Sequence, residues 1–431
     1  MNEKVTDILL PSSDIPKVLN YKCLLCNEIG IAPEDVSDHK DRHGTRKRYG
    51  LLLPQSLWTP QAQSTQVPTY SSPMIAKALG VSHVYIRDEG ANYSGSMKDY
   101  IVKRCVAQGQ LLGKKRFAVV SSGNHAVSLA MHAARADSEA IVFTPASSSK
   151  IALLATFSNV VVVGMHGALF EDVYNLVTHI DLGDSIYNAN ACNEDLLPGL
   201  LGVAQDIRNL DPQPTHVLAG VGNGTYLAGI GFGLLRNAST HIKIVPCGMK
   251  GAFPTEDAFR NGTPIEEYAA FAIDEHLIDA AEGSIALESY SMPQLMHAVK
   301  STQGFPLGDL TNDDLTAAYR LLASDAHLLA RGAIPEPTGI MSLAAALKWK
   351  STFDSTSVLH CSFTGHGVKD LETILRLVPD ETGKALTERA MHARPDLLPN
   401  TTSESRGVVL YINKDTTSER LQRLLGERAQ I

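Results

Sequence analysis

The sequence predicts an α/β protein in which twisted, mostly parallel β-sheets are flanked by helices. Its 431 residues, 44% of them hydrophobic, are enough for two or three domains with sizeable cores. From Gly50 onward, short apolar runs alternate with stretches in which apolar residues recur at helical spacing. Glycine and small hydroxyl residues follow several of these runs, as is typical where a buried strand turns into a helix.

Each expected strand is a short apolar run bounded by polar or turn residues. The expected strands cover residues 84–86, 116–120, 140–143, 160–163, 216–218, 243–247 and 358–362. Between them, residues 126–136 carry apolar side chains at helical spacing and predict a helix. The Pro-, Gln-, Ser- and Thr-rich residues 54–72 predict a linker, and the polar stretch after Asp370 predicts a C-terminal extension.

Composition and charge exclude several classes of function. The net charge of −8 gives no general attraction to nucleic acid, and residues 1–17 lack the basic start and continuous apolar stretch of a signal peptide. Residues 217–235 carry no charge, but six glycines and Asn223 favour a strand, a turn and a helix over a membrane span. We therefore expect a soluble, cytoplasmic protein with no membrane partner and no nucleic-acid partner.

The N-terminal region carries a metal-ligand pattern. Cys23, Cys26, His39 and His43 have the C-x2-C-x12-H-x3-H spacing of a two-Cys, two-His zinc finger. Two thiolates from a knuckle and two imidazoles four residues apart on a helix would close a tetrahedral shell, which indicates structural Zn2+. We expect this module over residues 18–48, as a cap or docking element in preference to a reader of DNA, because one finger covers only about three base pairs.

Two segments combine small residues with a nucleophile or with anion-binding groups. Lys98 follows the run Ser-Gly-Ser-Met at an expected helix start, where the positive end of the helix dipole lowers the pKa of an amine and favours Schiff-base formation. The second segment follows the strand at 116–120 and aims hydroxyl and backbone N–H groups at an anion. It consists of Ser121, Ser122, Gly123, Asn124 and His125.

Two further segments follow expected strands. Glycine-rich residues after the strand at 216–218 let the backbone close around a phosphate group at a helix start. They are Gly222, Asn223, Gly224 and Thr225. The segment lacks both the Lys-Ser/Thr ending of a nucleotide P-loop and an acidic ribose partner, which favours a single phosphate monoester. Thr364 follows the strand at 358–362, and a hydroxyl at the end of a buried strand can bond a ring nitrogen without protonating it.

Together these segments resemble the fold-type-II pyridoxal-phosphate enzymes, and among them the threonine synthase family. That family carries Gly-Ser-Phe-Lys-Asp around its cofactor lysine, matched here by Gly-Ser-Met-Lys-Asp at 95–99. Its Ser-Ser-Gly-Asn turn stands at 121–124, and its Thr-Gly-His-Gly-Leu-Lys-Asp segment is matched at 364–370 with one change. A Glu-Pro pair at 336–337 and Ser-Leu-Ala at 342–344 echo a further motif, so the resemblance covers about residues 48–370.

The resemblance implies a two-domain fold like that of the tryptophan synthase β-subunit, pyridoxal 5'-phosphate as cofactor, an amino-acid substrate and a homodimer. It implies a large cofactor-binding domain at 49–102 and 188–380, a small mobile domain at 103–187 and an extension at 381–431. By the same resemblance, Lys98 attaches the cofactor and transfers a proton, and Asn124 contacts the cofactor's phenolic oxygen. Residues 222–225 bind the cofactor's phosphate group, and Thr364 contacts its pyridine nitrogen. The implied substrate-binding residues are Ser121, Ser122, Gly123 and His125.

The sequence departs from the threonine synthase pattern at one place. The family's Asn-Pro-x-Arg-x-x-Gly-Gln-Lys segment, whose arginine helps bind the substrate phosphate, corresponds to residues 190–199, where the arginine is missing and Glu194 and Asp195 have entered. Two acids repel a phosphate dianion, although Lys150 remains a candidate substrate contact.

We therefore expect β- or γ-elimination or replacement on an altered amino-acid substrate. Three alternatives stay open. The first is a true threonine synthase acting on O-phosphohomoserine. The second is deamination of the serine/threonine dehydratase type, which the Asn-His-Ala run at 124–126 resembles. The third is a non-catalytic regulator that senses pyridoxal phosphate and carries a zinc finger.

Overall fold

The computed structural model divides the chain into two units. The larger unit comprises Pro16–Met97 and Glu194–Leu398, and the smaller comprises Met1–Ile15, Lys98–Asn193 and Pro399–Ile431. The structure describes residues 21–23, 29–31, 52–54, 65–121, 123–148, 151–168, 170–179, 185–190, 194–236, 240–262, 280–284, 291–398, 407–413, 416 and 418–426.

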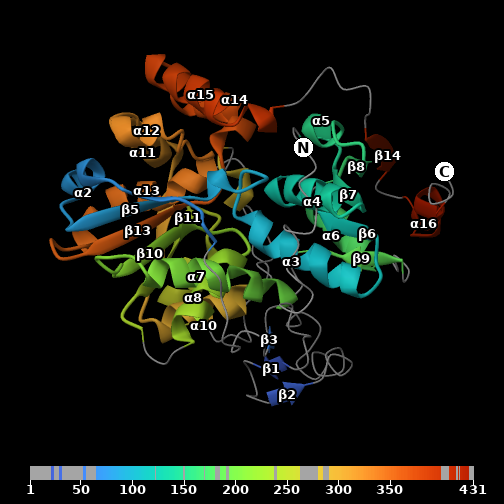
Figure 1. Cartoon of the computed structure of the whole chain (residues 1–431), viewed down its shortest axis with the longest axis horizontal. Helices are drawn as coiled ribbons and strands as arrows, with labels where there is room; N and C mark the ends of the chain where they lie inside the picture. Colours follow the sequence, from blue (N-terminus) through green and yellow to red (C-terminus); the bar gives the residue numbers. More distant parts are fainter. Residues whose placement is uncertain are drawn as a thin grey trace, which may run out of the picture. The chain divides into compact units, whose positions relative to one another are not determined.

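The larger unit is built on a six-stranded sheet with the strand order β12-β11-β10-β13-β5-β4 (Figure 1). All neighbouring strands are parallel except β4, which runs antiparallel to β5. The strands are β4 (Thr69–Ser71), β5 (His83–Asp88), β10 (His216–Gly220), β11 (Lys243–Met249), β12 (Leu307–Leu310) and β13 (Val358–Phe363). The central strands are mostly apolar because parallel strands are covered on both faces, although β13 also buries His360 and Ser362.

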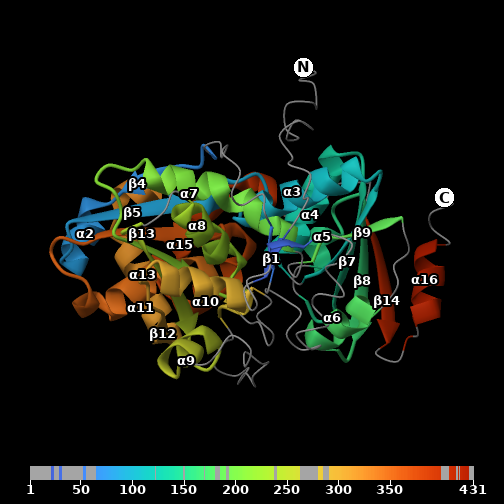
Figure 2. The same cartoon turned by 90° about the horizontal axis from the view of Figure 1, so that it is seen from below.

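Helices cover both faces of this sheet. Helix α8 (Thr225–Leu235) lies with α7 (Leu201–Arg208) and α10 (Met292–Ser301) over one face, and α13 (Pro337–Lys348) packs on the other (Figures 1 and 2). Because α8 is enclosed by its neighbours, ten of its residues are buried and it is apolar all round. The other α-helices that the structure describes in this unit are α2 (Pro73–Leu79), α9 (Pro254–Arg260), α11 (Asn312–Ala323), α12 (Ala326–Ala330), α14 (Leu371–Leu377) and α15 (Glu381–Ala393).

The smaller unit has a five-stranded, wholly parallel sheet with the order β14-β8-β7-β6-β9. Its strands are β6 (Arg116–Val120), β7 (Glu139–Pro145), β8 (Val160–His166), β9 (Ile186–Asn188) and β14 (Val408–Asn413). Helices α4 (Asn124–Arg135) and α6 (Phe170–His179) pack on the sheet, and α3 (Lys98–Leu111) packs on α4. The short α5 (Ile151–Leu154) also contacts α4.

The predicted fold class is confirmed, and each predicted strand lies within or coincides with an observed one. Residues 217–235 form most of β10, a turn and α8, as predicted. In the part of the chain that the structure describes, none of the helices has the length and apolar character needed to cross a bilayer.

The predicted linker at 54–72 is wrong in part. Residues Thr69–Ser71 form β4, the antiparallel edge strand beside β5, and Thr65 hydrogen-bonds the Asp206 carboxylate (2.5 Å). The run that contains β4 is short and mostly polar, and only its pairing with β5 gives it strand structure.

Three short strands near the N-terminus form a separate antiparallel sheet. They are β1 (Tyr21–Cys23), β2 (Ile29–Ile31) and β3 (Leu52–Pro54), in the order β2-β1-β3. Strands β1 and β2 form a hairpin in which Tyr21 pairs with Ile31.

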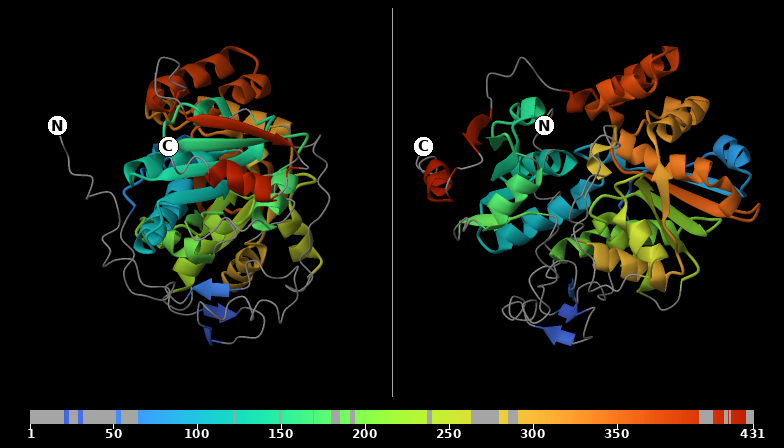
Figure 3. Two further views of the ribbon diagram at one scale, coloured as in Figure 1. Left: turned by 90° about the vertical axis from the view of Figure 1, so that its right-hand side faces the viewer. Right: turned by 180° about the vertical axis from the view of Figure 1, so that it is seen from behind.

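The end of the chain belongs to the core of the smaller unit. Strand β14 pairs along its length with β8, and α16 (Ser418–Gly426) follows it (Figure 3). Leu421 and Leu425 of α16 are buried, and the Arg116 guanidinium donates to the Leu425 carbonyl (3.1 Å). The last strand and helix therefore stabilise a sheet whose first strand in the chain, β6, begins about 300 residues earlier.

Replacing Leu421 with alanine should lower the free energy of unfolding by about 2–3 kcal/mol, because it leaves a cavity in a buried apolar contact. Chemical denaturation followed by circular dichroism measures this. The exposed Arg423→Ala on the same helix should change stability by less than about 0.5 kcal/mol. Equal values for the two variants would mean that α16 is not part of the core.

Candidate active site

Three of the four segments singled out in the sequence leave one edge of the larger unit's sheet. Parallel strands β5, β13 and β10 are neighbours, so their carboxyl ends lie side by side. Residues 89–97 follow β5, residues 364–370 follow β13, and residues 221–225 follow β10. The carboxyl edge of such a sheet is where α/β proteins bind their ligands.

The loops after β5 and β13 fold against each other. The Met97 N–H donates to the Thr364 carbonyl (2.9 Å), and the His366 N–H donates to the Gly95 carbonyl (2.8 Å). Thr364 is buried. Lys98 is the next residue after Met97, so the bond to Thr364 fixes the backbone where the lysine begins.

His366 has a structural role in this arrangement. Its Nδ1 accepts the Val368 N–H (3.2 Å), which leaves Nε2 to donate to the Gly332 carbonyl (3.1 Å). Burial lowers the pKa of His366 to about 4, so the ring is neutral at physiological pH.

In the smaller unit, α3 begins at Lys98 and its second residue anchors it to α4. The Ser128 hydroxyl donates to Asp99 Oδ1 (2.6 Å), and His132 Nε2 lies 3.2 Å from the same oxygen. Both partners belong to α4, which begins at Asn124. The carboxylate of Asp99 therefore links the helix that starts with the lysine to the helix that starts with the second sequence segment.

That second segment is a tight turn at the end of β6. The Ser121 hydroxyl accepts the N–H groups of Gly123 (3.2 Å) and Ala126 (3.3 Å), and α4 has no side-chain cap at Gly123. Burial, together with the charge of Lys98, lowers the pKa of His125 to about 3. Its buried Nε2 has no hydrogen-bond partner among the described residues.

The turn after β10 requires glycine at two positions. Gly224 adopts φ +84, which favours glycine, and α8 starts after it without a side-chain cap. A Cβ on Gly222 would lie 2.7 Å from the Gly283 carbonyl oxygen, so only glycine fits there. The Asn223 side-chain oxygen is buried and lacks a hydrogen-bond partner in the described ranges.

Sequence reasoning missed a second hydroxyl at this turn. Ser291 precedes α10, and its hydroxyl lies 2.9 Å from that of Thr225, while its N–H donates to the Asn223 carbonyl (3.2 Å). A lone serine before a helix is an ordinary cap in sequence, so no local signal distinguishes it.

The sequence model of one protein family, described as pyridoxal-phosphate dependent enzyme, matches residues 62–365. The chain belongs to this family. Threonine synthase from Methanocaldococcus jannaschii is 28% identical over 72% of this chain and 76% of its own length. Threonine synthase from Methanosarcina acetivorans is 25% identical over 78% of this chain and 82% of its own length.

Solved structures with similar coordinates share the fold. Maize serine racemase aligns over 73% of this chain and 91% of its own with a TM-score of 0.59 and 17% identity. Processed threonine deaminase isoform 2 from Solanum lycopersicum aligns over 80% of this chain and 93% of its own with the same TM-score and 16% identity. The two-unit α/β architecture is therefore that of the fold-type-II pyridoxal-phosphate enzymes.

The residues present fit pyridoxal phosphate. The turn at 221–225 offers a helix start, a position restricted to glycine and the Thr225 hydroxyl to a phosphate group. Rotation of the Asn223 amide about its last torsion presents an NH2 donor in place of the buried oxygen that lacks a partner. Thr364 adds a neutral hydroxyl side chain at the same sheet edge. These groups are the ones that would hold the cofactor in the larger unit.

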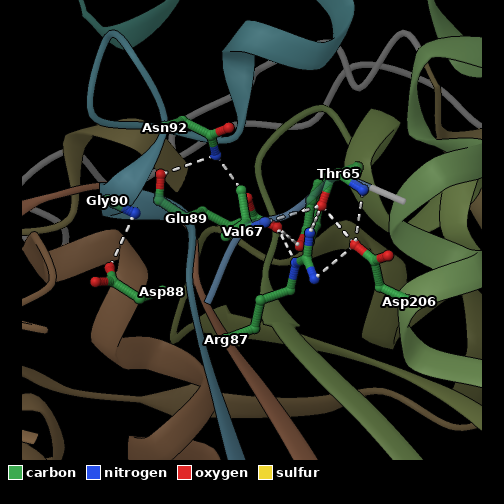
Figure 4. Close-up of polar contacts among 9 residues, drawn as sticks. Thr65, Val67, Arg87, Asp88, Glu89, Gly90, Asn92 and Asp206 are labelled. Carbon is green, nitrogen blue, oxygen red and sulfur yellow. Dashed lines mark hydrogen bonds and ion pairs between the residues drawn. The ribbon is translucent and has the colours of Figure 1, made fainter. Parts of the chain in front are cut away.

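A buried polar network lies beneath the loop that follows β5 (Figure 4). Arg87 donates to Glu89 (2.6 Å) and Thr65 (2.5 Å) and pairs with Asp206 (3.2 Å). Glu89 also accepts the Tyr226 hydroxyl of α8 (2.6 Å). Since Asp206 belongs to α7, the network connects two helices of one sheet face to the start of the loop that leads to Lys98.

Asp88 lies next to this network and is buried too. Burial raises the pKa of its carboxyl to about 7; the charge of Glu89 raises it further, while the Gly90 N–H and the charge of Arg394 lower it. The Gly90 N–H donates to Asp88 Oδ1 (3.0 Å), which shapes the first turn of the loop.

Several predicted site residues lie outside the described residues. They are Ser122, Lys150, Cys26, His39 and His43. The backbone of Cys23 ends β1, and Glu194 and Asp195 begin the 3-10 helix η6 (Glu194–Leu200). Within the described ranges, no group of three or more His, Cys, Asp or Glu side chains is placed to hold a metal ion.

Replacing Asp88 with asparagine should stabilise the protein at pH 8 by about 2–4 kcal/mol, because each unit of raised pKa costs about 1.4 kcal/mol at a pH where the acid is charged. The folded state of the wild type binds a proton between about pH 4 and pH 7 that the unfolded chain does not. Its stability relative to the variant therefore falls as the pH rises through this window.

Urea denaturation of both proteins from pH 4 to pH 8 measures that difference. The exposed Asp137→Asn, at a left-handed position that suits asparagine, is the control and should show no such pH-dependent gap. A gap for Asp88→Asn that is constant with pH would contradict the raised pKa.

Proposed function

We propose that the protein catalyses elimination or replacement at the β- or γ-carbon of an amino-acid substrate that differs from the substrate of threonine synthase. The observation that carries this proposal is the joint placement of Thr364 and Met97. A neutral threonine, in place of an acid, stands at the sheet edge, and its backbone carbonyl accepts a hydrogen bond from the N–H of the residue before Lys98. A partner that does not protonate the pyridine nitrogen favours elimination and replacement over transamination.

The chain's own residues divide the work. Lys98 binds the cofactor through its side-chain amine and moves the proton of the substrate α-carbon. The Ser121 turn and the N-terminus of α4 hold the substrate carboxylate, with Asn124 directed to the cofactor. Residues 222–225 hold the phosphate group. When bound, pyridoxal phosphate supplies the electron sink that makes the α-proton acidic.

The substrate assignment rests on the segment at 190–199. The similarity to threonine synthases supports chemistry of their type, whereas the missing arginine and the two acids Glu194 and Asp195 disfavour a substrate that carries a phosphate dianion. The deaminating alternative draws support from the Asn-His-Ala run at 124–126, and deaminases are among the proteins that share the fold.

Purified protein should show the visible absorbance band that pyridoxal phosphate gains on a lysine amine, and Lys98→Ala should lack it. Amino acids with a leaving group at the β- or γ-carbon should change the band and exchange their α-proton in D2O. Release of a 2-oxo acid and ammonia would identify elimination, and their release from serine or threonine would identify the deaminating alternative. Threonine and phosphate from O-phosphohomoserine would identify threonine synthase and overturn the altered substrate.

Racemisation without loss of a substituent would also overturn the reaction type. A protein that binds the cofactor but exchanges no α-proton, and that binds DNA with a steep dependence on salt, would indicate the non-catalytic regulator.

We also propose that the N-terminal module binds structural zinc. The four-ligand spacing supports it, and so does the β1–β2 hairpin, because Cys23 ends β1 and Cys26 falls in the connection between the two strands. A knuckle of this kind presents two thiolates on one side of a turn.

Purified protein should contain about one zinc ion per chain, measured by plasma mass spectrometry. Cys26→Ser and His43→Ala should each lower the zinc content and leave the visible absorbance of the cofactor unchanged. The exposed His392→Ala should keep the full zinc content. Metal-free protein after expression in zinc-supplemented medium would exclude the module.

A further inference from the structure

The loop of residues 89–97 receives many of its hydrogen bonds from an arginine that lies far along the chain. The guanidinium of Arg394 donates to the carbonyl oxygens of Gly90 (2.5 Å), Asn92 (2.8 Å) and Tyr93 (2.8 Å). Backbone carbonyl groups outside helices and strands need hydrogen-bond donors from elsewhere, because a buried acceptor without a partner lowers the stability of the fold. The five N–H groups of a planar guanidinium allow one side chain to serve three of them.

A second cation serves the next two carbonyls. The Lys369 ammonium donates to Ser94 (3.3 Å) and Gly95 (3.1 Å). Arg394 and Lys369 together are called the carbonyl clamp below. Lys369 belongs to the segment at 364–370, whose backbone also binds this loop, whereas Arg394 directly follows α15.

The position of Arg394 is itself fixed. Asp396 pairs with its guanidinium (2.8 Å), and the Arg394 side chain is 16% exposed. In the same turn, the 3-10 helix η12 (Pro395–Leu397), the buried Leu397 packs against Gly95. A Cβ on Gly95, which adopts φ +75, would lie 2.4 Å from Leu397 Cδ1. The turn that carries the arginine therefore contacts the loop through both polar and apolar groups.

We infer that Arg394 is a positioning residue, which holds the loop of residues 89–97 in the shape that presents Lys98 to the cofactor. This inference rests on the proposed role of Lys98 for its consequence, but the loop contacts stand independently of it. Loss of the guanidinium removes the donor that Gly90 and Tyr93 share, two residues that lie at opposite ends of the first turn of the loop. The loop then opens more often, and the lysine that follows it loses its fixed starting point.

The inference is tested with Arg394→Ala, Arg394→Lys and the control Arg389→Ala, whose side chain is exposed on α15. Amide hydrogen exchange of the cofactor-free protein is measured for the peptide of residues 89–97 and for a peptide from β13. In Arg394→Ala, the amide hydrogens of the loop should exchange at least about tenfold faster than in the wild type, and those of β13 should exchange at the wild-type rate. Arg394→Lys should recover part of the protection, because one ammonium can reach only some of the three carbonyls.

The second readout is the affinity for pyridoxal phosphate, measured by titration of the visible band. We expect Arg394→Ala to weaken it by about tenfold, which corresponds to about 1.4 kcal/mol, and Arg389→Ala to leave it unchanged. Faster exchange spread over both peptides would indicate a general loss of stability and overturn the inference, as would wild-type exchange in the loop. If the wild type binds no cofactor, the proposed function fails, while the exchange measurement still decides the role of the carbonyl clamp.

Discussion

The parallel pairing of β13 with β5 on one side and β10 on the other is the constraint on which the site of the larger unit depends. The register places Phe363 opposite Asp88 and Ser362 opposite Ala219. All three strands therefore leave the sheet at the same level, and their loops meet without long connections. A shift of one residue would exchange the two faces of β13 and move Thr364 away from Met97. The hydrophobic packing of the sheet and the geometry of the site are thus set by the same register.

The second requirement is that the charges near this edge are paired. Arg87 and Glu89 are almost completely buried, and a buried charge without a partner is strongly destabilising. Their mutual bond and the contacts of Thr65, Asp206 and Tyr226 satisfy them. A connected polar network of this kind favours one geometry, since each member fixes the direction of the next. In this way the network connects α8, the helix that follows residues 221–224, to the loop of residues 89–97 before Lys98.

The sequence was informative where the signal is local. Apolar runs bounded by turn residues identified seven of the parallel strands but missed β9, β12 and β14, and their motifs identified the loops at the strand ends. Strand β4 and the role of Arg394 could not be predicted, because their structure depends on partners elsewhere in the chain; the carbonyls that Arg394 binds lie about 300 residues before it. Ser291 has the appearance of an ordinary helix cap for the same reason. Strand β14 is an apolar run after a Pro- and Asn-rich break, and only the open edge of β8 makes it part of a sheet.

The protonation states of the site histidines bear on the type of reaction. A racemase must deliver a proton to the face of the α-carbon opposite the one from which it was removed, so it needs a second acid that is protonated at the working pH. His125 and His366 have pKa values of about 3 and 4, because both are buried. Neither carries a transferable proton as an imidazolium at neutral pH. Neither histidine is therefore the second acid that a racemase would need, and Lys98 remains the proposed group that removes the α-proton.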